Sequence, residues 1–159
     1  MDQQQIFVQM VMKAWNIQVK STTQFFDSLD DQSLYKEVAP GKNRIIYLMG
    51  HLIAVNDTMI SLFGVGERLY SHFDEPFVNH PDKSGLQIPE AAELRKEWRI
   101  SNEVLTAHFG KISPEDWFKK HTAMSDEDLA KEPGRNKLSV LINRTNHLAN
   151  HLGQLLLAK

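Results

Sequence analysis

The sequence predicts an all-α fold in which residues 1–159 form one domain, a four-helix bundle. Four long segments carry apolar residues at intervals of three and four, the spacing of an amphipathic helix. No segment shows the sustained period-two alternation of a strand, and no Asn-Gly or Asp-Gly hairpin turn occurs. The length of 159 residues, with 42% apolar and 24% charged residues, fits one globular core.

The first helix is expected over about residues 3–28, with one buried apolar face. Asn43 is a suitable N-cap for the second helix, and Gly64 suits its end. The residues that we expect to face the core from the first helix and just beyond it are Ile6, Phe7, Met10, Val11, Ala14, Ile17, Phe25 and Leu29.

Pro89 is expected in the first turn of the third helix, which Gly110 ends. The last helix is expected to begin near Ser139 and to bury Leu141, Ile142, Leu148, Leu152, Leu155 and Leu156. We also expect core positions for Trp15, Trp98 and Trp117.

Two segments lack this periodicity. Residues 65–88 contain Pro76, Pro81 and Gly85, and read as a long connection between the second and third helices that crosses the bundle or closes over a site. Residues 119–137 read as a polar excursion that matches no motif.

Composition excludes several functional classes. The chain has no cysteine, which excludes disulfides, iron–sulfur clusters and thiol nucleophiles, so that any metal must be bound by histidine or carboxylate. The net charge of −2 offers no basic surface for nucleic acid. No run approaches a membrane span and the first residues show no leader pattern, so we expect a soluble cytoplasmic protein.

Three of the seven histidines are candidates for a metal site. His147 and His151 are four residues apart in the last helix, so their rings lie on one face and can reach one ion. His51 lies in the most apolar stretch of the chain, where an unpaired ring would be costly. His51 either bonds to the backbone or points into the same pocket as His147 and His151. For His147 and His151, the alternative to metal binding is a solvated helix face.

Better-known metal motifs are absent. The stretch from His147 to His151 lacks the glutamate of an HExxH peptidase, and no glutamate stands three residues before any histidine, as di-iron bundles require. A mononuclear site with three neutral histidines and an open position is what remains, and it resembles a catalytic zinc site.

The stretches Leu48-Met49-Gly50-His51-Leu52 and Asn146-His147-Leu148-Ala149-Asn150-His151-Leu152-Gly153-Gln154 resemble those of the DinB/YfiT-like superfamily of bacterial four-helix proteins. In that family a histidine of the second helix and a His-x-x-x-His-x-Gly-Gln run in the fourth form a metal triad. The resemblance implies an up-down-down-up bundle, a divalent metal, usually zinc or nickel, on His51, His147 and His151, and frequently a homodimer.

The resemblance also implies a class of reaction. Characterised members include transferases that use low-molecular-weight thiols such as bacillithiol or mycothiol, and a few isomerases or hydrolases. We therefore expect a metal-dependent S-transferase or hydrolase acting on small molecules. The alternatives are a noncatalytic metal-binding or stress-response bundle, and a dimeric structural protein whose histidines fill polar core sites.

Four further residues carry expectations. Gln154 either orients a ligand or is an exposed polar residue. Arg144 either attracts an anionic substrate or is a surface or salt-bridged arginine. Asp57 faces away from His51 and is not expected to be a ligand. Gly153, inside a helix, suggests the close approach of another helix or a substrate.

Overall fold

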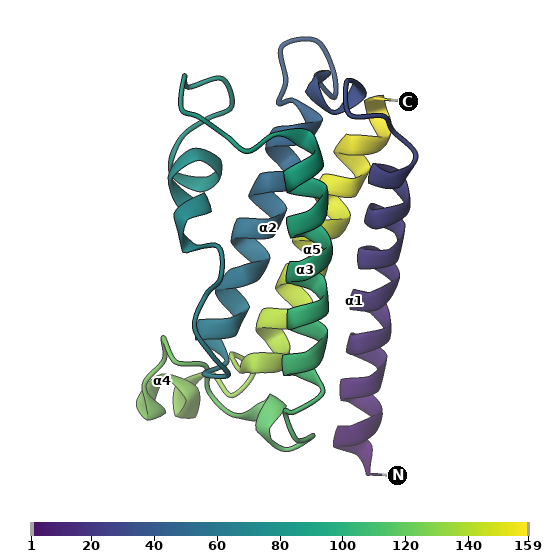
Figure 1. The fold of residues 1–159 in the computed structure, drawn as a ribbon. Helices are drawn as coiled ribbons and strands as arrows, with labels where there is room; N and C mark the ends of the chain where they lie inside the picture. The colour runs from purple at the N-terminus through teal and green to yellow at the C-terminus, as the bar shows by residue number, and fades with distance from the viewer. Residues whose placement is uncertain (1, 159) are drawn as a thin grey trace.

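The computed structural model describes residues 2–158 and consists of helices and the loops between them. Among these residues the only β-type pairing is an isolated bridge between Glu37 and Arg44, so the all-α prediction is confirmed. In Figure 1, two long helices run from bottom to top and the two between them in the chain run downward. The four long helices, in chain order, are α1 (Gln3–Asp27), α2 (Ile45–Leu62), α3 (Ala91–Phe109) and α5 (Lys137–Leu155).

The helix α2 forms the centre of the core. It packs against both α3 and α5, and α5 also packs against α1. Its mean hydropathy of 1.4 over 18 residues would suffice for a membrane span, which the sequence had not led us to expect. However, 72% of those residues are buried inside the bundle, as in the core helix of a soluble protein.

The three tryptophans occupy the core, as predicted. Trp15, Trp98 and Trp117 are each at most 2% exposed. Trp98 also joins α3 to α1, because its indole Nε1 donates a hydrogen bond to Thr23 Oγ1 at 2.9 Å and its ring meets Phe26 edge-on. The buried polar end of this side chain is therefore satisfied.

Three helix starts differ from the prediction by one or two residues. The N-cap of α2 is Arg44 rather than Asn43, because the Asp82 carboxylate accepts from the backbone N–H of Arg44 and holds that residue in an extended conformation. Pro89 precedes α3, whose N-cap is Glu90. The last helix begins at Lys137, where Asn136 and Ser139 form a reciprocal capping box.

The polar excursion contains a short helix that the prediction missed. This helix, α4 (Asp126–Lys131), begins at Ser125, whose side chain accepts from the backbone of Asp128 while the Asp128 carboxylate accepts from Ser125. The helix buries none of its own side chains, so it has no apolar periodicity and only its cap could have revealed it.

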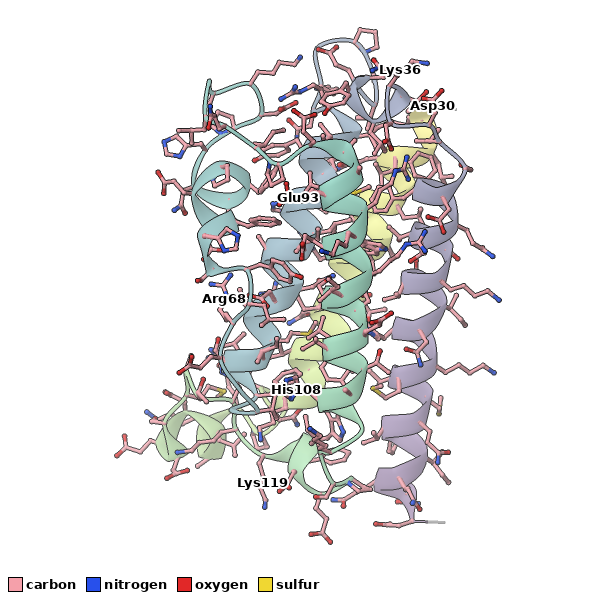
Figure 2. The ribbon with its side chains drawn as sticks, viewed as in Figure 1. Asp30, Lys36, Arg68, Glu93, His108 and Lys119 are labelled. Carbon is pink, nitrogen blue, oxygen red and sulfur yellow. The ribbon has the colours of Figure 1, made fainter. Side chains whose placement is uncertain are left out.

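The long connection between α2 and α3 is folded onto α2. It contains two short helical turns, Ser71–Phe73 and Glu75–Asn79. The buried carboxylate of Asp57 anchors its start, accepting from Arg68 Nε at 3.1 Å and from two backbone N–H groups at 3.0 Å. Arg68 is labelled in Figure 2, where it lies beside α2.

One prediction about burial is wrong. Ile6, Phe7, Met10 and Ile17 of α1, together with Ile142 of α5 and Leu156, are 41–62% exposed. The apolar residues of α1 occupy two faces, and only the face with Val8, Trp15, Phe25 and Phe26 packs into the core. The remaining apolar residues leave a shallow groove of about 280 Å³ between α1 and α5, lined by Phe7, Met10, Val11, Ala14, Ile142, Thr145 and Asn146.

Candidate metal centre

The packing of α2 against α5 brings three histidines together. His51 belongs to α2, and His147 and His151 occupy neighbouring turns of α5. The Nε2 atom of His147 lies 3.2 Å from that of His51 and 3.1 Å from that of His151. All three rings offer a nitrogen within 4.8 Å of the others. Residues separated by almost a hundred positions therefore form one cluster.

Hydrogen bonds at the opposite ring nitrogens orient two of these rings. His51 Nδ1 donates to the carbonyl oxygen of Phe77 at 2.8 Å, and His151 Nδ1 donates to Gln154 Oε1 at 3.0 Å. A neutral imidazole with its proton on Nδ1 carries a lone pair on Nε2. Both rings thus direct a lone pair toward His147.

Hydrogen bonds within the histidine cluster cannot satisfy all three Nε2 atoms, because too few protons are present among them. His147 can donate one proton from Nε2 to one neighbour only, and its Nδ1 is buried without a partner among residues 2–158. If His147 instead carries its proton on Nδ1, three lone pairs face one another. A divalent ion accepts all three, so the donor set fits a metal.

The spacing of the nitrogens also fits a metal. Two histidine nitrogens at about 2.05 Å from a tetrahedral zinc ion would lie about 3.3 Å apart. The distances of 3.1 and 3.2 Å are close to that value. The three-histidine group can therefore hold a divalent ion with small adjustments of the rings.

Burial keeps the three imidazoles neutral. It lowers the pKa of His51 and His151, and it lowers the pKa of His147 from 6.5 to about 4, with further contributions from His151, His51 and Arg144. Metal binding requires unprotonated histidine. The cluster is thus in its ligand form at neutral pH.

Two residues that support His51 escaped the sequence analysis. The ring of Phe77 is fully buried and fills the space beside Gly50, where a Cβ would come within 3.0 Å of three ring carbons. Tyr47 stacks on the His51 ring and donates its hydroxyl hydrogen to the carbonyl of His80 at 2.7 Å. A glycine within an apolar helix was the one signal of this close approach.

Residues 15–155 match the family model of the DinB superfamily, which is most of the chain. The chain belongs to the DinB superfamily. No curated protein matches it closely enough to count as a relative.

The remaining expected site residues of this DinB-superfamily chain have mixed outcomes. Gln154 contacts the cluster directly through His151, whereas Arg144 donates to Thr58 Oγ1 at 3.2 Å and forms no ion pair among residues 2–158. Asp57 anchors the long connection. The expected close approach of another helix to Gly153 is wrong, because among residues 2–158 no atom beyond its chain neighbours and its own helix backbone lies within 4 Å of where its Cβ would stand. The close approach of a substrate to Gly153 stays a prediction.

Proposed function

We propose that this chain is a divalent-metal enzyme in which His51, His147 and His151 hold zinc or nickel. The observation that supports this most strongly is the convergence of three Nε2 atoms, two of them oriented by hydrogen bonds at Nδ1, in a DinB-superfamily chain. Three protein ligands leave an open position for a substrate, which is the arrangement of catalytic sites.

The proposed reaction is transfer of a small thiol to an electrophile, with the related hydrolysis as its variant. A bound divalent ion with three neutral ligands would keep its full charge and lower the pKa of a thiol or water placed beside it. The thiol then loses its proton to solvent, its sulfur forms a bond to the electrophilic carbon, and the leaving group departs with the bonding electron pair.

The protein's own part is to fix the ligand geometry. The carbonyl of Phe77 and the amide oxygen of Gln154 hold the rings of His51 and His151, so little reorganisation is needed when an ion binds. The ring of Tyr47 lies nearly parallel to that of His51, with the ring centroids 6.3 Å apart, and adds to the packing on this side of the site. Such support raises both the affinity for the ion and the basicity of the ligands.

The first test is the metal content of tag-free protein, measured by plasma mass spectrometry. We expect about one zinc or nickel ion per chain. His147→Ala should lower the affinity by about 100-fold or more, since it removes a ligand rather than a supporting group, and should leave the helical circular dichroism unchanged. His121→Ala, which removes a half-buried histidine of the excursion, is the matched control. Protein that takes up no metal even after reloading would refute the proposal.

The second test addresses the reaction. Cobalt-loaded protein is titrated with a small thiol, and a sulfur-to-cobalt absorption band is expected as the thiol takes the open position. The loaded protein is then assayed for conjugation of the thiol to 1-chloro-2,4-dinitrobenzene. Tight metal binding without any spectral response to thiol or any turnover would instead indicate a noncatalytic metal-binding protein.

A further inference from the structure

Arg144 lies on the face of the bundle that contains the histidine cluster. It is three residues before His147 on α5, and Thr58, its partner on α2, is seven residues after His51. Along this face His51, Thr58, Arg144 and His147 are all half-buried, in contrast to the mostly buried remainder of α2. A molecule bound at the histidine cluster can therefore extend toward Arg144.

Arg144 is the only one of the six arginines that has no carboxylate partner among residues 2–158. Burial lowers the pKa of the Arg144 guanidinium, and no carboxylate among residues 2–158 offsets this effect. The partners of the other five arginines are Asp82 for Arg44, Asp57 and Asp74 for Arg68, Asp31 for Arg95, Asp27 for Arg99 and Glu132 for Arg135.

The hydrogen bonding of Arg144 is also incomplete. Its Nε atom is buried without an acceptor, and its one hydrogen bond runs from Nη2 to the hydroxyl oxygen of Thr58. That hydroxyl donates its own hydrogen to the Val55 carbonyl, so it can only accept from Arg144. A guanidinium is suited to bind a carboxylate through two parallel hydrogen bonds, and Arg144 has donors left for this purpose.

A purely structural role does not account for this arrangement. A partly buried cation without a counter-ion costs stability, and an apolar side chain of similar length would pack between the helices without that cost. The charge also acts on the cluster, because Arg144 contributes to lowering the pKa of both His51 and His147. The positive charge therefore lies on α5 close to the histidines and has no carboxylate partner among residues 2–158.

We propose that Arg144 binds a carboxylate of the substrate, so that the site selects small anionic thiols over uncharged ones. The inference rests on the proposed function, because the thiol sulfur is placed at the histidine cluster while the carboxylate lies at Arg144. Thr58 positions the guanidinium by holding Nη2, which leaves Nη1, a donor without an acceptor among residues 2–158, for the substrate carboxylate.

The test compares two thiols of the same shape, 3-mercaptopropionate and its uncharged amide 3-mercaptopropionamide. Each is titrated into cobalt-loaded protein, and the sulfur-to-cobalt absorption band reports binding. The wild-type protein should bind the carboxylate about tenfold more tightly than the amide, the contribution of a charge-assisted hydrogen-bond pair. Arg144→Gln should bind the two thiols equally, while Arg135→Gln, which removes an exposed arginine of the excursion, should retain the preference.

A stability measurement separates this role from a structural one. Arg144→Met should leave the urea midpoint of the metal-free protein unchanged or raise it, because it removes an unpaired buried charge. A clear fall in the midpoint, or equal binding of both thiols by the wild-type protein, would overturn the inference. Failure of the wild-type protein to load with metal would refute the proposed function itself, and is a different result from loaded protein that shows no preference.

Discussion

The substitution Gly50→Ala tests how the long connection supports the metal site. A Cβ at residue 50 would come within 3.0 Å of three carbons of the Phe77 ring, which is fully buried. The ring must shift, and the carbonyl oxygen of Phe77, which accepts from His51, shifts with it. A change one residue from a proposed ligand thus acts through a different segment of the chain.

The expected effects follow from these contacts. Overpacking a core typically costs about 1–3 kcal/mol, and replacing a helical glycine by alanine returns about 1 kcal/mol, so the protein should lose up to about 2 kcal/mol. Loss of the hydrogen bond to His51 Nδ1 should lower the metal affinity by about 10- to 100-fold. Urea unfolding of the metal-free protein measures the first effect, and chelator competition with zinc measures the second.

Gly153→Ala is the matched control, since it makes the same change next to the same cluster but in open space. It should stabilise the protein by about 1 kcal/mol and keep the wild-type affinity for zinc. If Gly50→Ala behaves like Gly153→Ala in both assays, Phe77 does not fix His51 and this reasoning is wrong.

Two further predictions concern pH and assembly. In metal-free protein the unfolded chain gains a proton on His147 as the pH falls through 6.5, whereas the folded chain gains it only near pH 4. The free energy of unfolding should therefore fall between pH 6.5 and 4. Urea unfolding across this range should show a shallower fall for His147→Gln, and identical pH dependences of the two proteins would contradict the assignment. The homodimer implied by the family resemblance would cover the exposed apolar residues of α1 and α5. Light scattering should therefore find dimers for the wild-type protein and for the neighbouring control Gln9→Glu, and monomers for Met10→Glu. A monomeric wild-type protein at micromolar concentration would refute this prediction.

The sequence by itself was sufficient for the four long helices, because each has a repeat of three and four that depends only on local residues. It was also sufficient to select His51, His147 and His151 from seven histidines, since the family pattern and the i, i+4 spacing both lie in short stretches of chain. The start of α2 was displaced by one residue because a distant group, the Asp82 carboxylate, accepts from the backbone of Arg44.

Only the tertiary structure decided which surfaces are buried and which groups support the site. The apolar residues of α1 look alike in sequence, yet one face packs into the core and the other is exposed, because burial depends on where α3 and α5 lie. The bond from His51 to Phe77 and the missing partner of Arg144 likewise arise from contacts between distant segments. Periodicity reports the neighbours along a helix, whereas hydrogen-bond partners and counter-ions depend on the packing of the whole chain.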